Sequence, residues 1–138
     1  MNRKIRKIIT GLIIIIIIIA GGGIFYLSRG LNEGQNMLVD PIPQTALEDL
    51  PDGSYRGRHE FRRWTNEVEV VIENNEIKEI NIIEDIRFVR GNVQEDLFAR
   101  VKNNQSTDVD VISDATVTSK AYLQAITTAI NLGVAGQE

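Results

Sequence analysis

The most apolar part of the chain lies near its N-terminus. Residues 8–27 carry no charge and include seven consecutive isoleucines, Ile13 to Ile19. A helix of this length spans about 30 Å, the thickness of the hydrocarbon core of a bilayer. Isoleucine is a poor helix former in water, but in lipid the backbone can satisfy its hydrogen bonds only internally. The pattern therefore predicts a transmembrane helix.

Basic side chains cluster in front of this apolar run. Four of them precede it, and only Arg29 follows closely. The four are Arg3, Lys4, Arg6 and Lys7. By the positive-inside rule, the N-terminus lies in the cytoplasm and the rest of the chain lies outside. A cleavable signal peptide is the alternative, because residues 20–22 are small, but the apolar run continues to Leu27 and favours an uncleaved anchor.

The pattern divides the chain into three parts. Residues 1–27 form the cytoplasmic basic flank and the transmembrane anchor. Residues 28–51 hold all three prolines and are interpreted as an extended, extracytoplasmic linker, in which "TALEDL" is long enough for one helical turn. Asp52-Gly53 is a turn signal, and it opens a domain that spans residues 52–138.

An alternating pattern predicts a β-hairpin in this domain. In residues 67–73 valine and isoleucine alternate with glutamate, apart from an extra apolar Val71, which is typical of a half-buried strand. Asn74-Asn75 can adopt positive φ, so it predicts a two-residue hairpin turn. In the return strand Ile77 is out of phase with Ile80, which indicates a β-bulge near Lys78-Glu79.

Two helices and one more extended segment follow the hairpin. "VQEDLFARVKNNQS" has Leu97 and Val101 on one face, which indicates an amphipathic helix. Residues 107–112 are expected to be extended and to form the third strand, in the order β-β-α-β-α. "TSKAYLQAITTAINLG" predicts a helix with Thr118 as its N-cap and Gly133 at its end. The fold class is therefore α+β: one transmembrane helix, then a small domain with an antiparallel hairpin sheet and two packed helices.

The net charge of the domain restricts the classes of partner that it can bind. The chain has 15 basic and 19 acidic residues, and without the four of the N-terminal flank 11 basic residues face 19 acidic ones, a net charge of −8. Such a domain should avoid nucleic acid. The chain has no cysteine and one histidine, His59, so disulfides and a lipoprotein anchor are excluded and a metal site is not expected.

Residues 110–120, "DVISDATVTSK", lie between the extended segment and the last helix. On residue types alone they are an ordinary helix entry, because Asp and Ser are common helix caps. They also resemble the signature of the FMN-binding domain family, which runs Asp, two residues, Ser or Thr, Gly, Ala, Thr. The matching residues are Asp110, Ser113, Ala115 and Thr116, followed by Thr118 and Ser119. "DGSYRG" and the acidic hairpin after it are also similar to the family.

The resemblance implies FMN as the cofactor and Thr116 as its attachment point. In family members with covalent flavin, the last Thr of the motif bears FMN through a phosphoester bond made by a flavin transferase. The start of a helix suits a phosphate independently, because free N–H groups and the positive end of the helix dipole lie there. Small Ala115 allows close approach of the backbone, and Lys120 supplies a positive charge one turn on.

Two residues of the motif, Asp114 and Asp110, are acidic. Asp114 stands where the family pattern has Gly, and its charge would repel a phosphate ~5 Å away by roughly 1 kcal/mol in water-like surroundings. Its turn can survive, because Asp tolerates positive φ better than most residues. Asp110 could be a turn residue, but the family resemblance favours a role in orienting the motif, by accepting N–H bonds of the loop, or in recognition by the transferase.

Some side chains outside the motif have two interpretations each. Trp64 and Phe61 could cover the isoalloxazine ring of FMN, but core packing is favoured. Arg87 and Arg90 could meet a phosphate or ribityl chain, or form a solvated face. His59 is expected at the surface.

The sequence as a whole indicates a membrane-anchored, extracytoplasmic FMN domain that carries electrons, with no catalytic residue of its own. Its expected partners are the flavin transferase, a membrane reductase or quinone-linked complex, and the lipid bilayer. Whether it has an enzymatic activity stays open. The alternative is a flavin-free member of the fold that acts as an interaction or sensor domain of the cell envelope.

Overall fold

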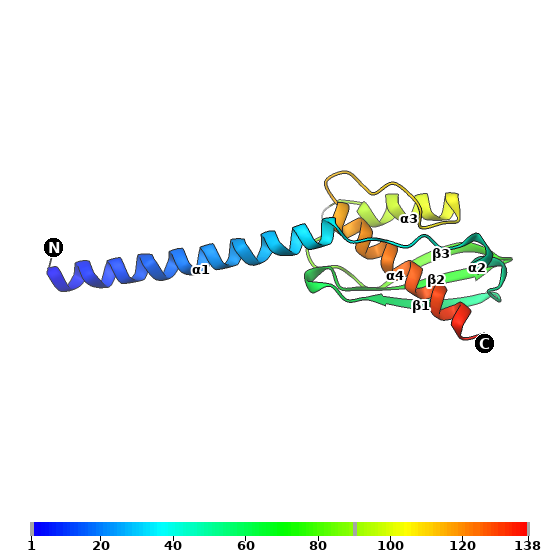
Figure 1. Cartoon of the computed structure of the whole chain (residues 1–138), viewed down its shortest axis with the longest axis horizontal. Coiled ribbons are helices and arrows are strands. Elements are labelled where there is room, and N and C mark those ends of the chain that lie inside the picture. Colours follow the sequence, from blue (N-terminus) through cyan, green and yellow to red (C-terminus); the bar gives the residue numbers. More distant parts are fainter. Residues whose placement is uncertain (1, 90, 138) are drawn as a thin grey trace. The chain divides into compact units, whose positions relative to one another are not determined.

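The structure is a computed structural model that describes residues 2–89 and 91–137. It separates into two compact units, Met1–Asn36 and Met37–Glu138. In chain order the elements are α1 (Arg3–Gln35), α2 (Gln44–Glu48), β1 (Gly53–His59), the 3-10 helix η1 (Arg62–Trp64), β2 (Asn66–Glu73), β3 (Glu76–Glu84), α3 (Val93–Asn104) and α4 (Thr116–Ala135) (Figure 1). The predicted α+β fold is confirmed, because a long apolar helix precedes a three-stranded antiparallel sheet and further helices.

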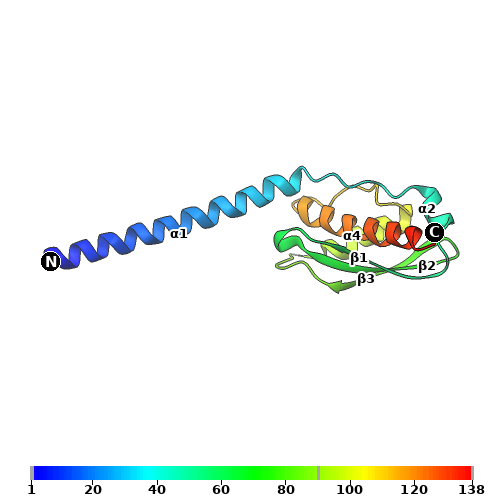
Figure 2. The ribbon, with the colours of Figure 1, turned by 60° about the horizontal axis from the view of Figure 1, so that its bottom comes forward.

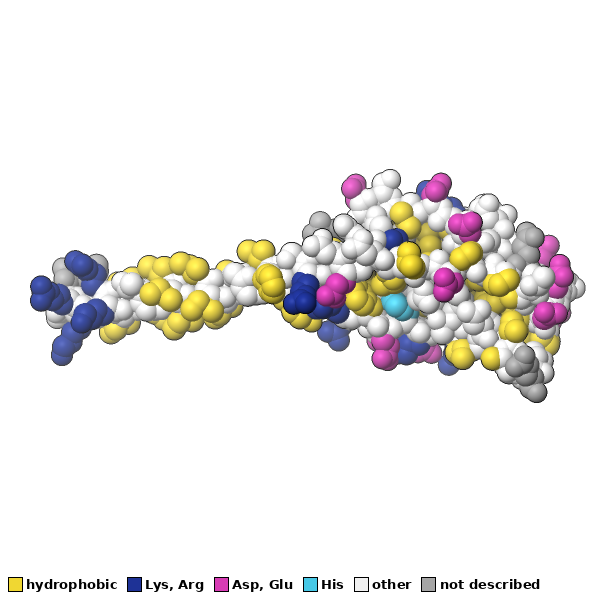
Figure 3. Space-filling view, in the orientation of Figure 1, with side chains coloured by type: hydrophobic (Ala, Val, Ile, Leu, Met, Phe, Trp, Pro, Cys, Tyr) yellow, Lys and Arg dark blue, Asp and Glu magenta, His cyan; other side chains and the backbone are white. Residues whose placement is uncertain are grey.

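Within the described residues, α1 is the one helix long and apolar enough to cross a membrane. Its apolar side chains face outward all round, and those from Ile13 to Ile19 are 51 to 68 % exposed. Basic side chains gather at its start, and hydrophobic side chains cover the stretch that follows (Figure 3). A signal sequence near the N-terminus passes the same test of length and composition, so this test does not separate an anchor from the cleavable alternative.

The predicted hairpin is confirmed in detail. β2 pairs with β3, and the turn between them has φ of 53° at Asn74 and 62° at Asn75. Val71 pairs with Glu79 but Ile72 pairs with Ile77, so Lys78 is the extra residue of the predicted bulge. The bulge restores the phase of the return strand. The inward side chains of β2 at 68, 70 and 72 are fully buried.

α4 covers one face of the sheet and packs most closely on β1 and β2 (Figure 2). Its buried stripe includes Tyr122, Ile126 and Ile130, as the sequence predicted. The contact with β1 is made by backbone. A Cβ atom on Gly57 would lie 2.0 Å from the carbonyl oxygen of Ala125, so only glycine allows this approach.

The third strand is not the one that the sequence predicted. Residues 107–112 form a loop that joins no sheet, and β1 pairs with β2 instead. β1 shows little alternation because glycine, at Gly57, faces α4 in place of an apolar side chain. The loop 107–112 is tied elsewhere: the Thr107 hydroxyl accepts the N–H of Ile42 (3.1 Å) and lies 3.2 Å from the Thr127 hydroxyl.

Both predicted ends of the last helix were wrong. α4 begins at Thr116 with Ala115 as its N-cap, so Thr118 lies in the first turn. It continues past Gly133 to Ala135. Gly133 is kept small by packing rather than by helix termination, because a Cβ atom there would lie 2.6 Å from the ring of Tyr55 and 2.8 Å from Leu50.

Part of the predicted linker belongs to the compact domain. α1 extends beyond Leu27 to Gln35, and the second unit begins at Met37. Four apolar side chains of residues 37–51 are 3 to 8 % exposed. They are Ile42, Ala46, Leu47 and Leu50. The one helical turn predicted at "TALEDL" is present as α2.

Gln105 joins the end of α3 to the edge of the sheet. It adopts a left-handed conformation with φ of 51° and caps the helix. Its side-chain amide accepts a hydrogen bond from the N–H of Ile77 (2.6 Å) and donates one to the carbonyl of the same residue (3.1 Å). The side chain therefore pairs with β3 as a neighbouring strand would.

Candidate functional site

The motif loop turns sharply just before α4. The N–H of Ala115 donates to the carbonyl of Ile112 (3.1 Å), and the helix begins with the bond from the N–H of Ser119 to the carbonyl of Ala115 (2.8 Å). Asp114 lies at the bend with φ of 61°. This is the left-handed region that favours glycine, which gives a physical reason for glycine at this place in the family pattern. Asp114 adopts it too, because Asp tolerates this region better than most residues.

Ser119 of α4 holds the motif loop from its buried side. Its side chain is fully buried, and its hydroxyl accepts the N–H of Ile112 (3.1 Å). Of the residues that the sequence assigned to cofactor binding, Ser119 is therefore one that positions the motif from within the domain, whereas exposed Ser113 and Asp114 face outward.

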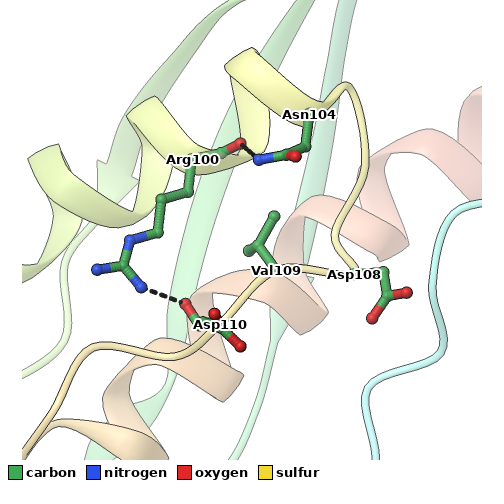
Figure 4. Close-up of a pocket in the computed structure, with 5 residues that line it drawn as sticks. All are labelled: Arg100, Asn104, Asp108, Val109 and Asp110. Carbon is green, nitrogen blue, oxygen red and sulfur yellow. Dashed lines mark hydrogen bonds between the residues drawn. The ribbon is translucent and has the colours of Figure 1, made fainter.

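Arg100 of α3 holds the other end of the loop. Its guanidinium donates to the carbonyls of Asp110 (2.9 Å) and Val111 (3.5 Å). Figure 4 shows the first of these bonds beside a polar cleft of about 510 Å³, which Arg100 and Asp110 line together with Asn104, Asp108 and Val109. The carbonyl of Asp110 thus fixes the loop, while its carboxylate stays exposed.

A second hollow lies along the motif and has a volume of about 430 Å³. It brings together side chains from four segments of the chain. They are Arg63 of η1, Phe88 of the loop after β3, Val93 of α3, and Ser113, Asp114, Ala115 and Thr118 of the motif and the first turn of α4. Four of the predicted cofactor-binding residues therefore line one hollow.

The predicted attachment residue lies next to this hollow in sequence but is not among its lining residues. Thr116 is half-buried at the first position of α4. Within the described part of the chain its hydroxyl makes no hydrogen bond. Lys120, one turn further along α4, is also half-buried. Ala115 cannot cap the helix through its side chain, so the N–H groups of the first turn stay open to an anion.

Three lining residues were missed by sequence reasoning: Arg63, Phe88 and Val93. They lie far from the motif in sequence and carry no pattern of their own. The only available signal was Phe88 itself, an aromatic residue in a polar, irregular stretch. Arg87, which the sequence singled out instead, is exposed and does not line the hollow, and Arg90 lies outside the described residues.

The other aromatic residues fill the domain as the favoured interpretation had it. Trp64 is 3 % exposed and stacks on half-buried Phe61 with ring centroids 5.8 Å apart. His59 is half-buried rather than fully at the surface, and burial lowers its pKa. Neither Trp64 nor Phe61 lines the hollow.

A hydrogen bond connects α4 to the loop that carries Phe88. The Tyr122 hydroxyl donates to the carboxylate of Asp85, which also accepts the N–H of Ile86 (2.7 Å). Burial and this bond both raise the pKa of Tyr122, so the phenol keeps its proton. The ring of Tyr122 meets that of Phe98 edge to face at 5.5 Å. The loop after β3 is therefore anchored on the domain core.

Metal ligands do not gather in the part of the chain that the structure describes. No group of three or more His, Cys, Asp or Glu side chains there could hold a metal ion. The side chains that line the hollow offer two hydroxyls, one carboxylate, one guanidinium and one exposed aromatic ring.

Comparison with known proteins identifies the domain. Residues 64–131 match the model of the FMN-binding domain family. The matched segment runs from the end of η1 through β2, β3 and α3 and into α4, so it contains the motif and the whole lining of the hollow except Arg63. No curated protein matches the chain. The match gives FMN as the cofactor, and it identifies residues 64–131 as a domain of the FMN-binding domain family.

Proposed function

We propose that this protein is a membrane-anchored electron carrier whose FMN is linked by a phosphoester bond to Thr116. The FMN-binding domain and the apolar helix α1 support the coarser statement, a membrane-anchored FMN-binding domain. The observation that carries the finer one is the coincidence of motif and hollow: Ser113, Asp114 and Ala115 line the hollow, and Thr116 follows them directly at the helix start.

The residues around the hollow fit FMN. Ser113 and Thr118 offer hydroxyls, Arg63 offers a positive charge, and Phe88 and Val93 offer apolar contact. A volume of about 430 Å³ is typical of small-molecule sites. When bound, FMN supplies a ring that takes up and releases electrons, and the protein supplies position and electrostatics.

Attachment at Thr116 suits the start of α4. A phosphodiester keeps one negative charge, which the open N–H groups and the positive end of a 20-residue helix stabilise. Lys120 lies on the next turn and adds a positive charge. The flavin transferase has to reach the hydroxyl of Thr116, and exposed Ser113 and Asp114 leave the approach to the loop open.

The domain is proposed to lie outside the cytoplasmic membrane, where it passes electrons between a membrane reductase or quinone-linked complex and an acceptor. The basic residues before the apolar stretch of α1 favour this orientation. Protease added to intact cells should then remove the domain and leave α1. Protection of the domain would place it in the cytoplasm.

One observation favours a second function. Asp114 puts a carboxylate on the wall of the hollow, where the family pattern has glycine. A negative charge beside a phosphate site weakens it, so the domain could have lost its flavin and serve as an interaction or sensor domain.

Intact mass decides between the two functions. The full chain, exported and expressed with a flavin transferase, should gain the mass of one FMN minus water and fluoresce after denaturation. Thr116→Ala should abolish both signals, and Thr128→Ala is the matched control that keeps them, because Thr128 lies on the same helix but outside the hollow. An unmodified wild type would support the flavin-free function, and flavin retained in Thr116→Ala would move the attachment point.

A further inference from the structure

Two residues of the hollow belong to neither the motif nor the domain core. Phe88 lies in the loop between β3 and α3, and Arg63 lies in η1. A backbone bond from the N–H of Arg87 to the carbonyl of Arg63 (3.3 Å) holds these two segments together. Their side chains line the same hollow as Asp114 and Ala115.

Phe88 is unusually exposed for an aromatic residue of this domain. It is 85 % exposed, whereas Trp64, Phe98 and Tyr122 are 0 to 7 % exposed. Its φ of 64° is also costly, because bulky residues rarely adopt the left-handed region. Strain of this kind persists where the surroundings fix it and is common at ligand clamps. A flat apolar ligand in the hollow would cover the ring.

Arg63 is held in place by the core. Its guanidinium carbon lies 4.1 Å from the ring centroid of buried Trp64, which is a cation–π contact. The side chain is half-buried, and its Nε is buried without a hydrogen-bond partner in the described structure. A buried donor without a partner is destabilising, so a ligand acceptor at this position would be favourable.

We propose that Phe88 stacks on the isoalloxazine ring of FMN and that Arg63 is the fixed positive charge beside that ring. This inference rests on the proposed function for the flavin itself, but it assigns two residues that the motif does not contain. A positive charge favours the reduced flavin, because reduction adds negative charge to the ring. Arg63 would therefore raise the midpoint potential, against the opposing charge of Asp114 on the same wall.

Stacking by Phe88 is tested with the full-length, flavin-loaded protein. Phe88→Ser should increase quenching of the native flavin fluorescence by iodide, because the ring loses its cover. Leu132→Ser is the matched control, since Leu132 is 60 % exposed on α4 and lies outside the hollow. Equal quenching in wild type and Phe88→Ser would overturn the role of Phe88.

The role of Arg63 is tested by potentiometric titration of the same preparation. Arg63→Gln should lower the midpoint potential, and Arg63→Lys should restore it in part. Arg56→Gln is the control, because Arg56 pairs with Glu69 (3.3 Å) and does not line the hollow. An unchanged potential in Arg63→Gln would overturn the role of Arg63. A potential in Arg63→Lys as low as that in Arg63→Gln would show that Arg63 acts through structure and not through its charge.

Covalent loading and ring binding can fail separately. Fluorescence of the denatured protein reports the bond to Thr116, and the two tests above report contacts of the ring. If wild type carries no covalent flavin, the proposed attachment fails, and titration with free FMN then tests the ring site. Phe88→Ser and Arg63→Gln should each weaken that binding by about tenfold. Equal affinity in wild type and both variants would overturn the inference.

Discussion

The helix α1 and the compact domain use the same amino acid in opposite ways. Isoleucines of α1 from Ile13 to Ile19 are 51 to 68 % exposed, whereas Ile72, Ile126 and Ile130 of the domain are fully buried. Covering a side chain of this size is worth about 1.5–3 kcal/mol. The domain obtains this from its own core, but α1 has to obtain it from an apolar surrounding such as lipid.

The arrangement of polar residues accounts for the difference. In the domain, glutamates occupy three of the four outward positions of β2, so one face of the strand is partly exposed to water and the other is buried. In α1, no charge interrupts residues 8–27, so every face of the helix is apolar. A uniform apolar surface fits lipid, and an alternating one fits a folded core.

Removal of α1 should have the largest effect, because it separates the apolar helix from the compact domain. A chain that lacks residues 2–36 should lose membrane association completely, because the apolar surface goes with the helix. The domain should still unfold cooperatively at the same temperature, since residues 37–138 form a separate compact unit. Membrane fractionation and thermal unfolding by circular dichroism measure both effects. A truncated domain that is unfolded would show that the two units depend on each other.

Glycine-to-alanine substitutions should have the next largest effect, and they should change stability in the domain but not in α1. Gly57→Ala should destabilise the domain by about 3 kcal/mol, because backbone atoms of α4 have to move to make room for the Cβ atom. Gly22→Ala in α1 is the matched control, as nothing lies within 4 Å of its Cβ position. Urea unfolding of the domain measures both variants. Equal stability of Gly57→Ala and wild type would contradict the close contact of β1 and α4.

Tyr122→Phe should have a smaller effect that depends on pH. Loss of the hydrogen bond to Asp85 should cost about 1.5 kcal/mol at neutral pH. The folded-state pKa of Tyr122 is raised above that of the unfolded chain, so the corresponding stability is present below about pH 10 and is lost as the pH rises further. The variant should therefore lose less stability than wild type between neutral and strongly alkaline pH. Parallel curves of unfolding free energy against pH would contradict this.

Asp114 should give the smallest change. Asp114→Gly should stabilise the domain by about 0.5 kcal/mol, because glycine adopts φ of 61° without strain. Asp114→Ala should destabilise it by about 1 kcal/mol, because alanine lacks the tolerance of Asp for this region. Chemical denaturation of both variants tests the backbone, and flavin loading of Asp114→Gly tests the charge. Identical stabilities of the two variants would exclude the left-handed bend.

Local patterns in the sequence predicted most of the fold. The hairpin turn at Asn74-Asn75, the bulge at Lys78 and the buried face of α4 each follow from a pattern within a few residues. β1 could not be predicted in this way, because its inward position at Gly57 is occupied by the backbone of α4 rather than by an apolar side chain. A contact between distant segments leaves no periodic signal in either.

The candidate site was predictable only where the motif runs. Ser113, Asp114, Ala115 and Thr118 were identified by resemblance, and they line one hollow. Arg63 and Phe88 were not, because the fold brings them to the motif from positions 50 and 25 residues away. Asp110 and Ser119 were assigned to the motif from the sequence, but only the hydrogen bonds to Arg100 and Ile112 reveal that they hold the loop in place.

The amide of Gln105 has a consequence for contact between copies of the chain. An open sheet edge can pair with the same edge of a neighbouring copy and so form larger sheets. Gln105 occupies both backbone groups of Ile77 at the start of β3. The backbone groups of Ile77 are therefore not available to a neighbouring molecule. A single side chain, Gln105, thus opposes edge-to-edge aggregation at this end of the strand.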